Sequence, residues 1–155
     1  MATTHHYRAG CRWEGSTGSG YRDYDRSNSG RCPPADHELP LSAGAAFRGD
    51  ESRINPEQLL VLAASSCQLL SFLALAARNG LDVLAYADDA TAAMPVQAGP
   101  MSLASIELRP VVTVAPGTDP DRVLALVDRA HHECYVANTL ACPVIVEATV
   151  VVVVG

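Results

Sequence analysis

The feature that most constrains the fold is an apolar segment, residues 58–77, that contains no charged side chain. It follows Asn55-Pro56-Glu57, where the Asn can cap a helix, the Pro suits its first position and the Glu faces its positive end. Asn79-Gly80 then supplies a typical helix stop. We therefore predict one long helix, apolar on most sides and buried at the centre of a domain or dimer.

The same segment is long enough to raise the question of a membrane span. Polar residues interrupt it, however, and no positively charged residue flanks Glu57. We predict a buried core helix and no membrane partner. No signal peptide is visible after Met1, so we expect a cytoplasmic protein whose cysteines stay reduced unless they serve catalysis or bind a metal.

Length and charge narrow the class of protein further. The 155 residues suit a single domain over residues 1–155, and 48% of them are hydrophobic, as in a packed globular protein. The net charge of −6 disfavours a nucleic acid or an anionic membrane surface as partner.

Alternating and apolar stretches predict strands on both sides of the long helix. A second helix is expected after Thr118-Asp-Pro-Asp121, a sequence that resembles a capping box. We expect the last strand to be central in its sheet, because both of its faces are apolar. The order of elements predicts an α+β fold in which sheets wrap a buried helical layer. The predicted strands cover residues 7–13, 21–26, 38–47, 81–94, 103–115 and 144–154.

Two of the five cysteines occupy matched positions on the predicted helices. Cys67 lies midway along the long helix, and Cys134 falls on an apolar stripe of the second helix with Val123, Val127 and Ala130. If packing brings the two thiols together, they form a buried pair that can cycle between thiol and disulfide. Each cysteine alone would also suit a small buried apolar side chain.

The remaining candidate ligands give weaker signals. His131 and Cys134 share a helix face, but a metal site would need third and fourth ligands that the sequence does not offer. We predict no metal. Cys11, Cys32 and Cys142 show no partner in the sequence and are expected to be bystanders.

Two motifs resemble a known family. The stretch from Asn55 to Cys67 and the stretch Ala130-His-His-Glu-Cys-Tyr-Val-Ala-Asn138 are similar to the paired signatures of the OsmC/Ohr family, the osmotically inducible and organic hydroperoxide resistance proteins. The element order is similar too. Phe47-Arg48-Gly49-Asp50 and Leu108-Arg109-Pro110 resemble a less-studied OsmC-like branch. The resemblance implies an intertwined homodimer with strands wrapped around central helices and active sites at the interface.

The resemblance also implies an activity, the thiol-dependent reduction of organic hydroperoxides. Cys67 would attack the peroxide and Cys134 would resolve the resulting sulfenic acid as a disulfide. No bound cofactor is implied, and an external dithiol such as a lipoyl group would supply electrons. Glu57 and an arginine would assist the thiolate. One OsmC pattern places that arginine where this chain has Ala46, whereas Ohr proteins take it from the N-terminal hairpin.

Two arginines, Arg26 and Arg22, are candidates for the cation that activates Cys67. A cation must lower the pKa of Cys67, because burial alone would raise it. Arg26 shares a predicted strand face with Tyr24, so we favour Arg26, with Arg22 as the second candidate. Glu57 lies ten residues before Cys67, about 15 Å along one helix. We therefore expect Glu57 and the arginine to come from the partner subunit.

Two functions remain open at this stage. One is the peroxidase supplied by a dithiol. The other is a redox-sensing or apolar-ligand-binding module on an OsmC-like scaffold, without significant turnover. Consumption of a dithiol that depends on both peroxide and Cys67 would distinguish them.

Overall fold

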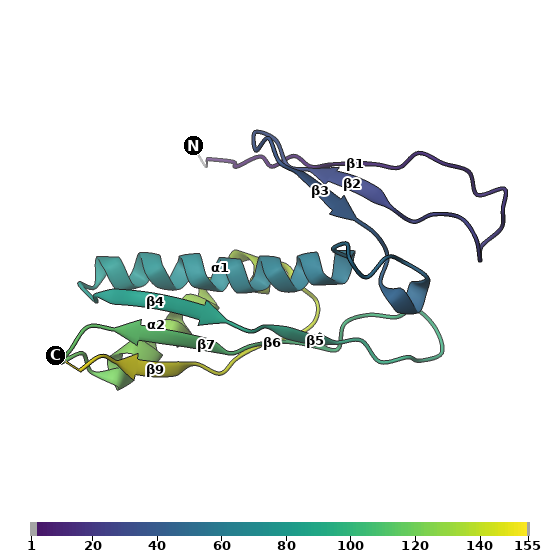
Figure 1. The fold of residues 1–155 in the computed structure, drawn as a ribbon. Coiled ribbons are helices and arrows are strands. Elements are labelled where there is room, and N and C mark those ends of the chain that lie inside the picture. The colour runs from purple at the N-terminus through teal and green to yellow at the C-terminus, as the bar shows by residue number, and fades with distance from the viewer. Residues whose placement is uncertain (1–2, 155) are drawn as a thin grey trace. The chain divides into compact units, whose positions relative to one another are not determined.

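The computed structural model describes residues 3–154 and divides the chain into two compact units. The N-terminal unit is Met1–Leu59 and the C-terminal unit is Leu60–Gly155. The mixed helices and sheets confirm the predicted α+β class (Figure 1). That residues 1–155 act as one domain stays a prediction.

The N-terminal unit contains a three-stranded antiparallel sheet in the order β1-β2-β3. Glycine is required where the chain turns after this sheet. A side-chain carbon on Gly49 would lie 1.6 Å from the carbonyl oxygen of Ala43, so no larger residue fits there without moving the backbone. The elements are β1 (Gly10–Arg12), β2 (Asn28–Arg31), β3 (Glu38–Leu41) and the short 3-10 helix η1 (Ala45–Phe47).

Two predictions for this unit were wrong. Residues 21–24 form turns rather than a strand, and the carbonyls of Tyr21 and Tyr24 accept hydrogen bonds from the Arg26 side chain. The strand begins later, at Asn28, in a stretch with no apolar alternation. The strand expected over residues 38–47 ends at Leu41 and gives way to η1.

Helix α1 (Pro56–Arg78) confirms the predicted long helix and both of its ends. Asn55 Oδ1 accepts a hydrogen bond from the Gln58 backbone N–H at 2.8 Å, and Gln58 Oε1 accepts one from the Asn55 N–H at 3.0 Å. This reciprocal pair satisfies two backbone donors at the helix start. Gly80 follows the helix with φ of +65°, a conformation that glycine adopts at little cost.

Two three-stranded sheets make up the rest of the C-terminal unit, in the orders β4-β7-β9 and β5-β6-β8. Each predicted long strand is split between them (Figure 1). One break falls at Arg109, whose N–H donates to Asp88 Oδ1 at 2.7 Å and whose neighbour Pro110 has no N–H to offer. The strands are β4 (Val83–Asp88), β5 (Thr91–Ala93), β6 (Ser105–Leu108), β7 (Pro110–Val114), β8 (Val144–Val146) and β9 (Thr149–Val152).

The last predicted strand does not lie where we expected it. Residues 144–154 contain β8 and β9, and each ends the strand order of its sheet. The centre is held by β6 and β7. A run of valines fits an edge strand as well as a central one, so apolar character on both faces did not determine the position.

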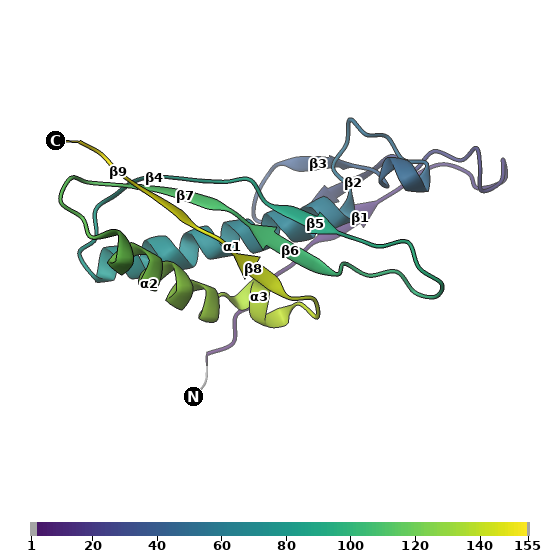
Figure 2. The same cartoon turned by 90° about the horizontal axis from the view of Figure 1, so that it is seen from below.

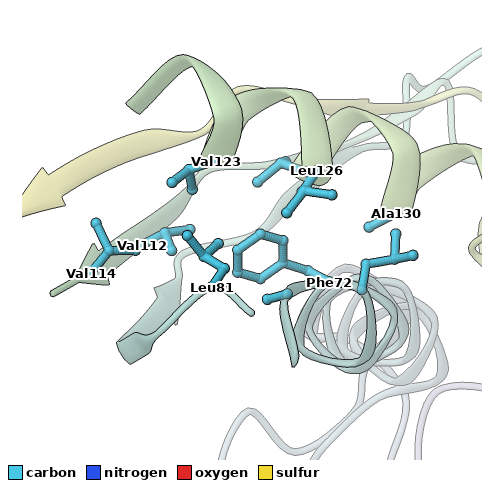
Figure 3. Packing of buried hydrophobic residues seen from close by; sticks show 10 residues of the cluster. Phe72, Leu81, Val112, Val114, Val123, Leu126 and Ala130 are labelled. Carbon is cyan, nitrogen blue, oxygen red and sulfur yellow. The ribbon is translucent and has the colours of Figure 1, made fainter. Parts of the chain in front are cut away.

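The core of the C-terminal unit joins α1, α2 (Pro120–His132) and the β4-β7-β9 sheet. Figure 2 shows α2 and α3 (Tyr135–Thr139) beside α1 in a second view. Phe72 of α1 is fully buried among Leu81, Val112 and the α2 residues Leu126 and Ala130 (Figure 3). Burial of a phenylalanine side chain contributes on the order of 2–3 kcal/mol to folding.

Helix α1 is buried on one face in the single chain rather than on most sides. Gln68 and Phe72 are buried, whereas Leu62 and Leu70 are 59% and 63% exposed. Its length and composition would also allow it to cross a membrane, a property it shares with core helices of soluble proteins. The packing of Phe72 and Leu75 against α2 and the sheet is that of a core helix.

Candidate functional site

The structure brings Cys67 and Cys134 into contact. Their thiols lie within hydrogen-bonding reach of each other, although the residues come from different elements of the C-terminal unit. Both are free thiols in this structure. Cys67 lies on α1 and is partly exposed, whereas Cys134 is only 1% exposed. The pair is therefore asymmetric, with one accessible sulfur backed by a buried one.

The sequence pattern predicted that Cys134 lies on the second helix. That prediction was wrong. Helix α2 ends at His132, and Cys134 has extended backbone angles at the start of α3. The apolar stripe of Val123, Val127 and Ala130 is buried as expected, but it ends one turn earlier. Glu133 is the C-cap of α2, and the Cys134 N–H donates to the His131 carbonyl at 3.2 Å in a tighter final turn, which leaves Cys134 at the junction of α2 and α3.

Burial raises the pKa of the Cys134 thiol above its ordinary value, and the adjacent Cys67 thiol raises it further. The backbone N–H groups of Ala137 and Val136 act in the opposite direction, because they donate to the sulfur and favour the thiolate. Cys134 is thus a protonated thiol at neutral pH and a poor first nucleophile.

A groove of about 420 Å³ opens beside Cys67. Its walls are mainly apolar, with Leu70 and Ala74 on the same helix face as Cys67, and Arg78 and Glu133 provide charge. A small molecule could reach the Cys67 sulfur from this side while Cys134 remains covered. The other lining residues are Ala63, Ser66, Ser71, Leu75 and Tyr135.

Arg26 is the buried cation of the N-terminal unit, with 9% of its surface exposed. Its guanidinium carbon lies 3.9 Å from the ring centre of Tyr24 and 5.1 Å from that of Tyr21. Its nitrogens donate to the carbonyls of Tyr24 at 2.8 Å and Tyr21 at 2.6 Å. The aromatic rings and carbonyls therefore fix the charge in place.

Glu57 and Arg26 line the same groove of about 560 Å³ in the N-terminal unit, together with Trp13 and Cys11. No salt bridge joins Glu57 and Arg26 among residues 3–154. Arg22 is exposed and does not line this groove. Of the two candidate arginines, only Arg26 is thus preorganised. The premise that Tyr24 and Arg26 share a strand face was wrong, because residues 21–27 form no strand.

Sequence reasoning missed a polar cluster behind the two cysteines. Ser65 Oγ of α1 donates to Asp88 Oδ2 of β4 at 2.5 Å, and Gln68 Nε2 donates to the Val127 carbonyl at 3.0 Å. The Tyr86 hydroxyl and the Gln68 carbonyl oxygen are buried without a hydrogen-bond partner in the described part of the chain. The available signal was the set of polar residues that interrupt the apolar helix, which we treated only as a sign against a membrane span.

The histidines form no metal centre in the part of the chain that the structure describes. No group of three or more His, Cys, Asp or Glu residues there could hold an ion. The rings of His131 and His132 instead lie edge to face, with centres 6.0 Å apart.

A family model described as OsmC-like protein matches residues 49–149, which include both cysteines. The chain belongs to the OsmC-like family. This confirms the resemblance seen in the sequence. A comparison with curated proteins gave no match.

Solved structures share the OsmC-like fold over nearly the whole chain. An OsmC-like protein of unknown function from Vibrio cholerae is 24% identical, with a TM-score of 0.84 over 94% of this chain and 100% of its own. An organic hydroperoxide resistance protein OsmC from Legionella pneumophila is 17% identical, with a TM-score of 0.71 over 96% and 98%. One from Elizabethkingia anophelis is 18% identical, with a TM-score of 0.70 over 97% and 98%. At identities of 24%, 17% and 18%, these structures show that the chain shares their fold.

Proposed function

We propose that this OsmC-like protein is a thiol-dependent peroxidase that reduces organic hydroperoxides to alcohols. The observation that carries the proposal is the contact between an accessible Cys67 and a buried Cys134. In the first step the Cys67 thiolate attacks the terminal peroxide oxygen. An S–O bond forms, the O–O bond breaks, and the leaving alkoxide takes a proton to become the alcohol.

The second step closes the disulfide. Cys134 attacks the sulfur of the Cys67 sulfenic acid, so an S–S bond forms and hydroxide leaves, taking the thiol proton to become water. An external dithiol then reduces the disulfide and is itself oxidised. No bound metal or cofactor takes part. We expect the reducing cytoplasm as the site of action, because it supplies dithiols.

The groove beside Cys67 supports organic over hydrogen peroxide as substrate. Leu70 and Ala74 offer an apolar wall that an alkyl group can cover, whereas hydrogen peroxide has no group to use it.

A cation must activate Cys67, and we propose Arg26 in this role with Glu57 beside it. Both line one groove of the N-terminal unit, and the fixed orientation of the Arg26 guanidinium supports the choice over Arg22. We propose that the partner subunit supplies them.

This assignment requires a homodimer, which we propose for a second reason as well. Helix α1 leaves Leu62 and Leu70 largely exposed, and a face of this kind in a small protein is normally covered by another chain. Ultracentrifugation should find a dimer at micromolar concentration. A folded monomer at that concentration would contradict the proposal.

The apolar groove also suits the second candidate, a redox-sensing or apolar-ligand-binding module. The deciding experiment measures loss of a dithiol in the presence of tert-butyl hydroperoxide. We expect catalytic consumption by wild type and by Cys142→Ser, and none above background by Cys67→Ser. Oxidation that stops after one equivalent in wild type would favour the sensing module.

A further inference from the structure

Arg26 lies near the end of a long connection between β1 and β2. Residues 13–27 form neither helix nor strand, and residues 14–23 are exposed. Residues 15–20 are all glycine, serine or threonine, a composition that leaves the backbone flexible. A buried cation carried by such a connection keeps one orientation only if some contact fixes the connection to the sheet.

The backbone of Arg26 is anchored from the side of β2. Its carbonyl accepts a hydrogen bond at 3.0 Å from Nδ2 of Asn28, the first residue of that strand. The guanidinium has other partners, because it donates to the carbonyls of Tyr21 and Tyr24 and lies over the Tyr24 ring. These partners belong to the connection, so the position of the charge depends on what holds Tyr24.

Trp13 makes the contact that holds Tyr24. It follows β1 directly, and its Nε1–H donates to the Asp25 carbonyl at 2.8 Å. Its ring meets the Tyr24 ring edge to face, with centres 6.4 Å apart and planes at 90°. The indole thus joins the end of β1 to the two residues that come immediately before Arg26.

The connection also leaves room for the indole. A side-chain carbon on Gly15 would lie 2.8 Å from a ring carbon of Trp13, so a larger residue there would have to displace the ring or the backbone. Trp13, Tyr24, Arg26 and Glu57 line one groove of the N-terminal unit. The contacts of Trp13 are therefore made at the wall of the groove that holds the cation.

We infer that Trp13 is a positioning residue for Arg26. It fixes the Tyr24–Asp25 turn to the end of β1 and so holds the guanidinium in the orientation in which it acts on Cys67, a role that rests on the proposed function. The attraction between two charges falls with distance, and a guanidinium that leaves its site is screened by solvent. Loss of the indole therefore weakens the effect of the cation without removing the cation.

The first measurement asks whether Trp13 holds Arg26, and it needs no activity. Trypsin cuts after Arg26 in the native protein only when this segment opens locally. We expect cleavage there to be about fivefold faster in Trp13→Leu than in wild type, the factor that corresponds to one lost hydrogen bond. Cleavage after Arg122, inside α2, should keep its rate, which excludes general unfolding. An unchanged rate after Arg26 overturns the inference.

The second measurement asks whether this hold acts on Cys67. The pH midpoint of Cys67 alkylation should rise by about half a pH unit in Trp13→Leu, less than in Arg26→Ala. Tyr7→Leu removes an aromatic ring that is 90% exposed and should leave the midpoint unchanged. In an Arg26→Ala background, Trp13→Leu should add no further shift, because no cation remains to be positioned.

The double variant separates positioning from a purely structural role. A shift by Trp13→Leu that is equal with and without Arg26 overturns the inference, because the indole then acts by another route. So does an unchanged midpoint in Trp13→Leu when Arg26→Ala shifts it. If Arg26→Ala leaves the midpoint unchanged while Trp13→Leu speeds cleavage after Arg26, the proposed role of Arg26 fails and the hold of Trp13 on Arg26 stands.

Discussion

Different kinds of contact stabilise the two units of this OsmC-like protein internally. The C-terminal unit buries ten residues in one apolar cluster of α1, α2 and the β4-β7-β9 sheet, with Phe72 inside it. In the N-terminal unit the strands are short and largely exposed, and a buried arginine binds carbonyls and aromatic rings. One unit thus builds an extended apolar core and carries the Cys67–Cys134 pair, whereas the other holds a charge by local contacts.

The largest expected effect is on peroxide turnover, which should depend on the cysteines of the C-terminal unit and not on Cys11 of the N-terminal unit. Cys67→Ser should reduce peroxide turnover to the uncatalysed background, because the nucleophile is lost. Cys11→Ser, in the N-terminal unit, should keep turnover within about twofold of wild type. Cys134→Ser should keep the first single-turnover attack and lose recycling. Steady-state and single-turnover assays check these outcomes, and equal loss of the first step in Cys67→Ser and Cys134→Ser would contradict the assigned order.

The next effect concerns stability. Phe72→Ala should lower the free energy of unfolding by about 3–5 kcal/mol, because it leaves a cavity in a fully buried cluster. Trp13→Ala should cost about 1 kcal/mol, since Trp13 is 39% exposed and makes one hydrogen bond to the Asp25 carbonyl and one edge contact with Tyr24. Urea unfolding measures both, and similar losses would remove the contrast between the units.

A smaller effect tests the proposal that Arg26 lowers the pKa of the Cys67 thiol. Arg26→Ala should raise the pKa of Cys67 by about 1–2 units, the usual scale for one close opposite charge. Arg22→Ala should leave it unchanged, because Arg22 is exposed. The pH dependence of Cys67 alkylation gives the answer. If neither variant shifts the curve, Arg26 is a structural residue of the N-terminal unit.

The smallest effect is on stability at alkaline pH. The pKa of Cys134 is raised in the folded protein, mainly by burial. Above the ordinary thiol pKa of about 8.5, the unfolded chain loses this proton and the folded chain keeps it, so the free energy of unfolding falls as pH rises. Cys134→Ala should make this fall shallower by up to about 1 kcal/mol per pH unit. Cys11→Ala should not, because Cys11 is exposed. Equal slopes for the two variants would show that the buried thiol does not control the effect.

The features that the sequence could predict depend on local chemistry or on a periodic pattern, whereas the features that it missed depend on particular tertiary contacts. The start of α1 depends on local chemistry at Asn55 and Gln58, and the apolar stripe of α2 on a periodic pattern, so both were predictable. The turn at Tyr21 depends on carbonyls that bind a side chain five residues later, and no periodicity signals it. The breaks in the long strands depend on contacts such as Asp88 with Arg109, across 21 residues.

The candidate site shows the same division. The motifs were enough to name Cys67 and Cys134, because the pair has a recognisable sequence. The position of Cys134 outside the helix, and the packing of Tyr86 against Phe72, depend on how α2 ends and how β4 packs on α1. These are tertiary contacts, and a single sequence does not contain them in readable form.

The central claim is that Cys67 and Cys134 form one redox pair. The most direct test treats the reduced protein with one equivalent of an organic hydroperoxide, blocks the remaining thiols and maps the cysteines by mass spectrometry. We expect a Cys67–Cys134 disulfide, with Cys11, Cys32 and Cys142 alkylated. A different pairing, or Cys67 oxidised to sulfinic acid while Cys134 remains a thiol, would contradict it.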